Sequence, residues 1–262
     1  MCEIYKAPIG WNPTELNPFT QMGNYGKEWS AFICDEEIRH YSNIYDGTMV
    51  YVLRVNPETD SKYERLFDYL TYETKHRRNV ILSLPEYIDF DEVLEMFDSF
   101  PSDNQFRGVD EKYLVHSTTK EYWDSIKKSG VLLSPNELKK QGINILEIGL
   151  KPMLEPGDYS DYVMLDVLAG CGELVVNSRQ LGYVCTNPDI EYIPGVRLYF
   201  DAEAIIKDGL GTRDGLHILK IKDKLPLDKY LLEWVSAESF QKKDWMPSTF
   251  TNEANKYFLE GR

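Results

Sequence analysis

Hydrophobic and polar positions form regular patterns once the first part of the chain is passed. Residues 1–45 hold prolines and glycines scattered among aromatics, which is typical of an irregular segment laid over a core. Residues 48–55 (TMVYVLRV) and 79–84 (NVILSL) are rich in β-branched and apolar residues and predict two buried strands. Capping boxes at 61–64 (SKYE) and 89–92 (DFDE) each precede an apolar helical spacing, so we expect an amphipathic helix after each.

A polar, turn-rich stretch at 101–105 (PSDNQ) is typical of a linker, and we place a domain boundary near residue 107. Beyond it, a capping box at 118–121 predicts a helix that Gly130 ends. The strands expected in this half lie at 112–116, 131–133, 161–165, 174–177, 196–200, 216–222 and 230–236, and Asp201 starts a short helix. Short strands with few helices, which cluster early, indicate an α+β fold rather than a doubly wound sheet.

The charge balance limits the classes of partner. The 262 residues include 29 basic and 43 acidic side chains, which gives a formal net charge of −14. Such a field repels phosphate backbones and anionic membranes, which argues against a nucleic-acid coat protein or a membrane binder. The N-terminus lacks a basic start followed by an apolar stretch, and no apolar run approaches the roughly 18 residues of a membrane span. We therefore expect a cytoplasmic protein.

Several kinds of site are excluded because the sequence lacks the motifs that they require. The four cysteines and four histidines are widely scattered without a C-x-x-C pair, which predicts reduced thiols and no structural zinc site. The phosphate loop, the dinucleotide fingerprint, the zinc-protease helix and the G-x-S-x-G elbow are also absent. The nearest glycine-rich element, Gly170-Cys171-Gly172, lacks the lysine of a phosphate loop, and we interpret it as a tight turn between strands.

The start of the second half remains as the candidate site. Residues 113–133 (YLVHSTTKEYWDSIKKSGVLL) read as a strand ending in His-Ser-Thr, then a helix, a glycine and an apolar strand. This resembles the opening of the ADP-ribosyltransferase-like fold, shared by NAD-dependent transferases and RNA 2′-phosphotransferases, in which YHxT precedes xxIxxxGL. The resemblance implies that His116 bonds the ribose of NAD and that Ser117 and Thr118 contribute to NAD binding.

Two later segments resemble the same family in the same order. The first, GVRLYFDAEAII at 195–206, resembles the strand on which transferases of the His-Tyr-Glu class carry a tyrosine that stacks on nicotinamide, and Tyr199 matches it. The second, at 216–240, resembles the closing strand pair and is loosely similar to DarT-type nucleic-acid ADP-ribosyltransferases. The resemblance makes Glu233 the candidate catalytic acid, which stabilises positive charge on the ribosyl ring, with Glu238 as second choice.

Each of these residues also has a simpler interpretation, and these stay open. A histidine at a strand end bonds a neighbouring carbonyl, and Tyr199 is one of 18 tyrosines, most of which pack in a core. Thr118 caps a helix, and Glu233 lies on the solvent face of an alternating strand. The basic run at 75–78 (KHRR) either holds a nucleic acid or simply complements the dipole at a helix end.

We therefore predict an α+β protein whose residues 108–262 form an ADP-ribosyltransferase-like split of two small packed sheets with flanking helices, preceded by a smaller α/β accessory region at 1–107. The expected activity is transfer of ADP-ribose from NAD to a nucleic acid or protein acceptor, as in a toxin or phage-defence effector. An antitoxin or inhibitor protein is the further partner expected. The alternatives are a non-catalytic interaction protein of the same fold and an RNA 2′-phosphotransferase-like enzyme, for which basic residues near His116 are few.

The accessory region is expected to influence the choice of acceptor rather than to supply catalytic groups. We interpret its charged side chains as solvent-exposed, because the sequence shows no cluster of titratable residues there of the kind found at active sites. His40 with Glu36 and Glu37 is the alternative site there, against an exposed acidic turn.

Overall fold

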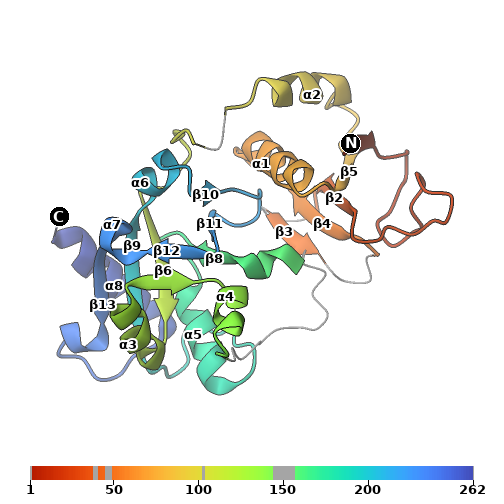
Figure 1. The fold of residues 1–262 in the computed structure, drawn as a ribbon. Coiled ribbons are helices and arrows are strands. Elements are labelled where there is room, and N and C mark those ends of the chain that lie inside the picture. Colours follow the sequence, from red (N-terminus) through yellow and green to blue (C-terminus); the bar gives the residue numbers. More distant parts are fainter. Residues whose placement is uncertain (1, 38–40, 45–48, 102–103, 144–156, 262) are drawn as a thin grey trace. The chain divides into compact units, whose positions relative to one another are not determined.

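The computed structural model describes residues 2–37, 41–44, 49–101, 104–143 and 157–261. The fold is mixed α/β, with several small sheets and, in the described part of the chain, eight α-helices. This composition is compatible with the α+β class. Figure 1 labels the elements along the chain.

The chain divides into two compact units. Unit 1 consists of residues 1–102, 152–159 and 212–217, and unit 2 consists of residues 103–151, 160–211 and 218–262. The first division lies close to the expected boundary near residue 107. Residues 152–159 and 212–217 also belong to unit 1, however, so a single boundary in the sequence does not separate the two units.

Unit 1 is built on one five-stranded sheet. The strand order is β1-β5-β2-β4-β3, and all neighbouring strands are parallel except β3, which is antiparallel to β4. Its elements are β1 (Ile4–Lys6), β2 (Trp29–Cys34), β3 (Tyr41–Ile44), β4 (Tyr51–Val55), α1 (Lys62–Lys75), β5 (Asn79–Ser83) and α2 (Phe90–Asp98).

The alternation of side chains along β2 shows how this sheet is covered. Trp29 and Ala31 belong to a cluster that the irregular residues 7–28 complete from one side. Phe32, on the other side, contacts Tyr69 of α1. The expected irregular segment over a core is therefore present, but residues 1–45 also contain strands that the sequence pattern did not reveal.

Unit 2 is assembled from three small sheets. Their strand orders are β13-β9-β6, β10-β11-β8 and β12-β7. The strands are β6 (Tyr113–Thr118), β7 (Val131–Leu133), β8 (Tyr162–Leu165), β9 (Val196–Asp201), β10 (Gly211–Thr212), β11 (Leu219–Lys222), β12 (Lys224–Pro226) and β13 (Leu231–Ser236). The helices are α3 (Lys120–Ser129), α4 (Pro135–Lys140), α5 (Gly172–Leu181), α6 (Ala202–Lys207), α7 (Leu227–Tyr230) and α8 (Pro247–Glu260), with a short 3₁₀ turn at Ala237–Ser239. A second 3₁₀ turn, Gly157–Asp161, begins in unit 1 and ends in unit 2.

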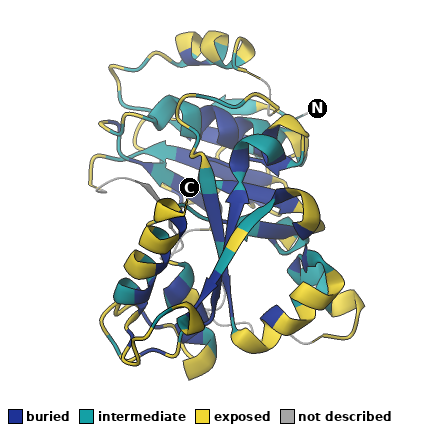
Figure 2. Ribbon diagram, turned by 90° about the vertical axis from the view of Figure 1, so that its left-hand side faces the viewer, coloured by how far each residue is buried: buried dark blue, intermediate teal, exposed yellow. Residues whose placement is uncertain are grey.

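The sheet β13-β9-β6 carries a hydrophobic core on each face. On one face, Leu114 and Leu198 join a cluster with Leu165 and Ile221 of the second sheet. The opposite face packs against α5 and α8 in a separate cluster that contains Tyr199. Figure 2 shows the resulting pattern, in which the strands are largely buried and the outer helix faces are exposed.

Most of the expected elements are found. The strand at 79–84 is β5, the strand at 131–133 is β7, and the strand at 161–165 is β8. Asp89 accepts bonds from the first turn of α2, as its capping box predicts. Gly130 ends α3 in the left-handed region, with φ of 69°.

Other expectations were wrong. Residues 174–177 lie inside α5, so the apolar run LVV is part of a helix rather than a strand, and the turn before it does not join two strands. Helix α3 is capped by Thr119, whose hydroxyl accepts from Tyr122 N, because Thr118 is still in β6. Ser61 precedes α1 but makes no side-chain capping bond. Helices are also not confined to the early part of the chain, since α8 lies near its C-terminal end.

Candidate functional site at the end of strand β6

The two three-stranded sheets of unit 2 meet at one bridge. Strand β6 is the edge of its sheet, and β8 is the edge of the other. Val115 and Asp166 exchange both backbone hydrogen bonds across this junction, at 2.8 and 2.9 Å. Because this bridge is isolated, β6 and β8 are not paired after Val115 in the described residues, and the His-Ser-Thr residues begin at this point.

His116 lies immediately beside this junction. It is paired with Leu198 across β6 and β9, and residues paired in this way point to the same face, so His116 faces the core shared by the two sheets. Its Nδ1 lies 3.1 Å from the carbonyl oxygen of Met164 in β8. That bond requires a proton on Nδ1 and leaves Nε2 as an acceptor when the ring is neutral.

The imidazole of His116 is neutral at pH 7. Burial lowers the pKa of His116 to about 4, the bond to Met164 opposes this, and the charge of Arg179 adds to the lowering. The first effect dominates because a partly buried imidazolium loses hydration that one carbonyl does not replace. His116 therefore combines a fixed orientation with an acceptor nitrogen, Nε2, that makes no hydrogen bond within the part of the chain that the structure describes.

Tyr199 lies on the opposite face of the same sheet. It is paired with Val115 and is fully buried, with its ring stacked on Phe258 at 4.1 Å. Its hydroxyl donates to Oδ1 of Asn255 at 3.1 Å. Burial raises the pKa of Tyr199, with Arg197 acting in the other direction. The ring and the hydroxyl of Tyr199 thus both make contacts inside the protein, which agrees with the interpretation of Tyr199 as a core-packing residue.

Ser117 also belongs to a buried polar cluster on that face. Its hydroxyl donates to Oε1 of Glu173 at 2.6 Å, and Arg197 Nη1 lies 3.3 Å from the same two oxygens. Tyr192 donates to the other oxygen of Glu173. Glu173 is 1% exposed and Arg197 is fully buried. We call Ser117, Glu173, Tyr192 and Arg197 the Glu173 cluster.

The Glu173 cluster also explains a glycine. A Cβ atom on Gly172 would lie 2.7 Å from the hydroxyl of Ser117, too close for any other residue without movement of the cluster. The Gly-Cys-Gly element is thus the tight start of α5 against β6. Thr118, the other residue expected to bind NAD, is 2% exposed.

The two candidate acids lie in different places. Glu233 is paired with Tyr199 and so is on the face opposite His116, where it is exposed and accepts from the backbone of Trp234 at 3.1 Å. Glu238 follows the end of β13 and forms an ion pair with Lys120, at the start of α3. Because β13 and β6 run in the same direction, Glu238 and His116 are at the same end of the sheet.

The sheet therefore does not bring His116, Tyr199 and Glu233 to one cleft. Strand pairing fixes which residues share a face, and His116 is one position out of phase with the other two. The individual catalytic roles of these residues stay predictions. At the end of the sheet that follows His116, the described charged pair is Lys120 with Glu238.

Sequence reasoning missed Arg179 and Tyr122. Arg179 lies in the last turn of α5 and is partly buried, yet it makes no ion pair or hydrogen bond within the described part of the chain. Burial lowers the pKa of Arg179, and Tyr122 of α3 opposes that change. The apolar run at 174–177 predicts a strand, and a strand there does not indicate the helix that carries Arg179.

A pocket of about 290 Å³ lies elsewhere in unit 2, between the starts of α5 and α8. Ala169, Leu174 and Pro247 form part of its wall, together with Cys171 and Glu173. Burial and the nearby Asp166 raise the pKa of the Cys171 thiol, so this cysteine lacks the lowered pKa of an activated nucleophile.

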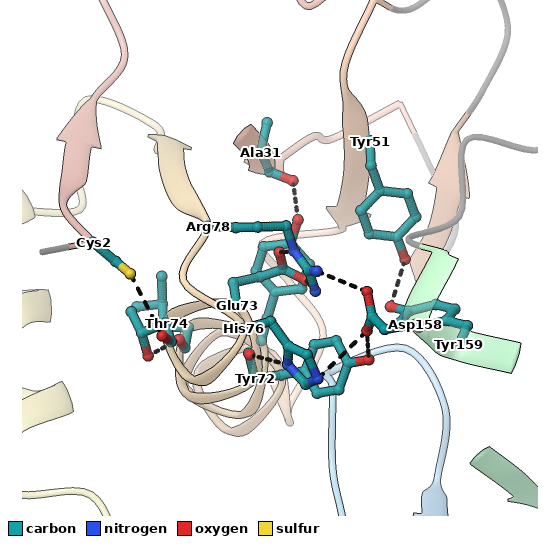
Figure 3. A network of polar contacts seen from close by, with 12 residues as sticks. Cys2, Ala31, Tyr51, Tyr72, Glu73, Thr74, His76, Arg78, Asp158 and Tyr159 are labelled. Carbon is teal, nitrogen blue, oxygen red and sulfur yellow. Dashed lines mark hydrogen bonds and ion pairs between the residues drawn. The ribbon is translucent and has the colours of Figure 1, made fainter. Parts of the chain in front are cut away.

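Unit 1 contains a buried ion-pair cluster around the basic run at 75–78. Figure 3 shows Arg78 between two carboxylates: it forms ion pairs with Glu73 and with Asp158, the latter at 2.7 Å. Tyr72 also donates to Asp158, and His76 Nε2 lies 3.5 Å from it. The expectation of only solvated charges in this region is therefore wrong.

The electrostatics of this cluster are those of a closed structural network. Burial raises the pKa of Glu73, against the opposing effect of Arg78. Burial would also raise the pKa of Asp158, but the bonds from Tyr72 and Arg78 outweigh it and the pKa is lowered. Because Arg78 is 8% exposed and paired twice, it is not available to a nucleic acid. The alternative site at His40 lies outside the described residues.

Within the described residues, no group of three or more His, Cys, Asp or Glu side chains is placed to hold a metal ion. None of the helices in those residues has the length and apolar character of a membrane span. No family model matches the chain, and neither a curated protein nor a solved structure is significantly similar to it.

Proposed function

We propose that unit 2 is an ADP-ribosyltransferase-like domain that transfers ADP-ribose from NAD to a macromolecular acceptor. The observation that carries this proposal is the position of His116, which faces the core between two small sheets at their single bridge. The expected order of strand, His-Ser-Thr turn, helix, glycine and strand also corresponds to β6, α3, Gly130 and β7. These features support a site at the end of β6.

In this proposal, His116 orients the substrate. Its Nδ1 is occupied by Met164, so Nε2 accepts a hydrogen bond from a ribose hydroxyl of NAD. The lowered pKa keeps the ring neutral at pH 7, and a neutral ring does not repel the positive charge that develops on the ribose. Thus burial of His116 serves the reaction as well as the fold.

Glu238 takes the role of the carboxylate, in place of Glu233. The hydrogen bond and charge of Lys120 lower the pKa of Glu238, so it is ionised at neutral pH. Its ion pair with Lys120, two residues after the end of β6, holds it at the same end of the sheet as His116. During transfer, the bond between ribose C1′ and the nicotinamide nitrogen breaks, and nicotinamide leaves with the electron pair. A lone pair of the acceptor forms the new bond to C1′, and the acceptor proton passes to solvent.

Release of nicotinamide from NAD by the full chain tests this function. We expect Glu238→Gln to slow release by about 100-fold, the usual scale for loss of one electrostatic stabiliser. Glu233→Gln is compared beside it, and Glu253→Gln, an exposed carboxylate on α8, serves as the matched control. A large effect at Glu233 alone would return the catalytic role to that residue.

The acceptor is tested separately with labelled NAD and a cell lysate. Digestion of the labelled product with nuclease or with protease distinguishes nucleic acid from protein acceptors, and co-purifying protein identifies an antitoxin or inhibitor. If calorimetry detects no NAD binding and no nicotinamide is released, the proposed activity is wrong. The non-catalytic interaction protein then remains, an alternative that the internal bonding of Ser117 and Tyr199 favours.

A further inference from the structure

The pocket between the starts of α5 and α8 is a cavity that the proposed function does not use. Its volume of about 290 Å³ is near the lower end of the usual range for ligand sites, so it suits a single ring system rather than a dinucleotide. Helices α5 and α8 cover the face of the sheet β13-β9-β6 that carries Tyr199, whereas His116 points to the other face. The pocket and the proposed NAD site are therefore separate.

The walls of the pocket are held in place by hydrogen bonds within the protein. On the α5 side, the carboxylate of Asp166 accepts from the backbone of Cys171 at 2.9 Å, which closes the turn before the helix. On the α8 side, Ser248 donates from its backbone to Pro188 at 2.9 Å and from its hydroxyl to Asp189 at 2.7 Å. Because both walls are already ordered, a ligand would not have to order them, and pre-organisation of this kind strengthens binding.

The lining of the pocket is largely apolar and favours a neutral ligand. The apolar walls are formed by Ala169, Leu174, Pro188 and Pro247. None of the described lining residues is a lysine, arginine or histidine, and the acidic one, Glu173, already accepts bonds on both carboxylate oxygens within the Glu173 cluster. An anion would therefore meet no cation in the pocket, and a cation would meet no available carboxylate. Burial of a charge without a partner is costly.

The α8 side of the pocket also carries polar groups that are available to a ligand. Thr251 and Asn252 both line it, and neither side chain makes a hydrogen bond within the part of the chain that the structure describes. A side-chain amide presents a donor and an acceptor side by side, and the hydroxyl of Thr251 adds a group that can do either. A carboxamide on a ligand presents the complementary donor and acceptor, while an attached ring matches the apolar walls.

We infer that this pocket binds a small neutral molecule whose ring contacts the apolar walls and whose carboxamide group pairs with Asn252. The inference goes beyond the proposed function and does not depend on transfer of ADP-ribose, because the pocket is on the face of the sheet opposite His116. Either can therefore fail without the other.

Ligand-observed NMR of the full chain with benzamide, benzoate and benzylamine tests the inference, because the three probes share a ring and differ in charge. We expect benzamide to bind saturably and at least about tenfold more tightly than either charged probe, since a charge would enter the pocket without a partner. Asn252→Ala changes an exposed side chain and should weaken benzamide binding about fivefold, the usual effect of one hydrogen bond. Glu253→Ala, the exposed neighbouring position on α8, is the matched control and should leave the affinity unchanged.

Cys171 reports whether the bound probe is in this pocket. Its side chain is exposed and lines the pocket, so bound benzamide should slow its alkylation by iodoacetamide in proportion to occupancy. Peptide mass spectrometry separates Cys171 from the other cysteines. Thr251→Trp fills the pocket and should abolish benzamide binding, with circular dichroism as the check that the variant folds. Ala169→Leu, at an exposed position, is a second filling variant with the same expected result.

Four results overturn the inference. They are no binding of benzamide by the wild type, equal or tighter binding of a charged probe, unchanged benzamide affinity in Asn252→Ala, and binding that neither slows alkylation of Cys171 nor is weakened by the filling variants. The last of these would place benzamide elsewhere, for example at the proposed NAD site. The proposed function fails in a different way: if benzamide protects Cys171 but no nicotinamide is released from NAD, the pocket stands and ADP-ribosyl transfer is wrong.

Discussion

The Glu173 cluster and the end of β6 differ in how they treat charge. In the Glu173 cluster, Arg197 and Glu173 are buried together, and Ser117 and Tyr192 complete the bonding of the carboxylate. At the end of β6, His116 is partly buried, as is Arg179 of α5, yet neither has a carboxylate partner in the described residues. A buried arginine is therefore not by itself a sign of function. The state of its partners distinguishes a structural arginine such as Arg197 from one whose charge no described carboxylate balances.

The first prediction tests whether the Glu173 cluster stabilises the fold. Arg197→Met leaves the carboxylate of Glu173 buried without its cation, and we expect a loss of about 3–5 kcal/mol in the free energy of unfolding. The double variant Glu173→Leu with Arg197→Met removes both charges and should recover part of that loss. Urea unfolding measures both. A double variant that is less stable than Arg197→Met would contradict the view that the unpaired carboxylate causes the loss.

The second prediction concerns the contribution of His116 to the pH dependence of the free energy of unfolding. The pKa of His116 is lowered from 6.5 to about 4 in the folded protein, so the unfolded chain binds more protons between these values. Stability is therefore complete above pH 6.5 and decreases as the pH falls toward 4, by up to about 3 kcal/mol from this residue. His116→Gln should remove that part of the slope. Asp158 adds a slope of the same sign at lower pH, because its pKa is also lowered.

The measurement is the difference between wild type and His116→Gln in urea unfolding at a series of pH values from 4 to 7. Asp158 and other carboxylates contribute equally to both proteins, so they cancel in this difference. A difference that does not change with pH would mean that His116 is hydrated, and would remove the basis for its neutral state in the proposed site.

Local patterns in the sequence were sufficient for the elements that depend on neighbouring residues. The strands β5 and β7 and the Asp89 cap follow from short-range apolar spacing and hydrogen-bonding chemistry. Helix α5 was missed because its apolar residues 174–176 are consecutive, and a short apolar run does not distinguish a buried strand from a helix segment. Strands β1 and β2 were missed because prolines and glycines in the surrounding loops dominated the pattern.

The candidate site was predicted only in part for a different physical reason. The sequence places His116 at a strand end, which is a local property and agrees with its position in β6. Whether Tyr199 faces the same side depends on the register between β6 and β9, and no local pattern specifies that register. That Arg179 has no carboxylate partner among the described residues is likewise a property of the folded chain, since only folding decides which carboxylates come near.

The third and smallest prediction assigns Tyr199 to one of the two regions. Tyr199→Phe keeps the ring stacked on Phe258 and removes one hydrogen bond to Asn255, whose oxygen still accepts from Arg197 at 3.1 Å. We expect a loss of about 1 kcal/mol in the free energy of unfolding, because a hydrogen bond between buried groups is worth that order and Asn255 keeps one partner. NAD affinity should not change, since the hydroxyl lies on the face opposite His116. Reduced NAD affinity with unchanged stability would place Tyr199 at the ligand instead, and the face assignment that separates the two regions would then have to be abandoned.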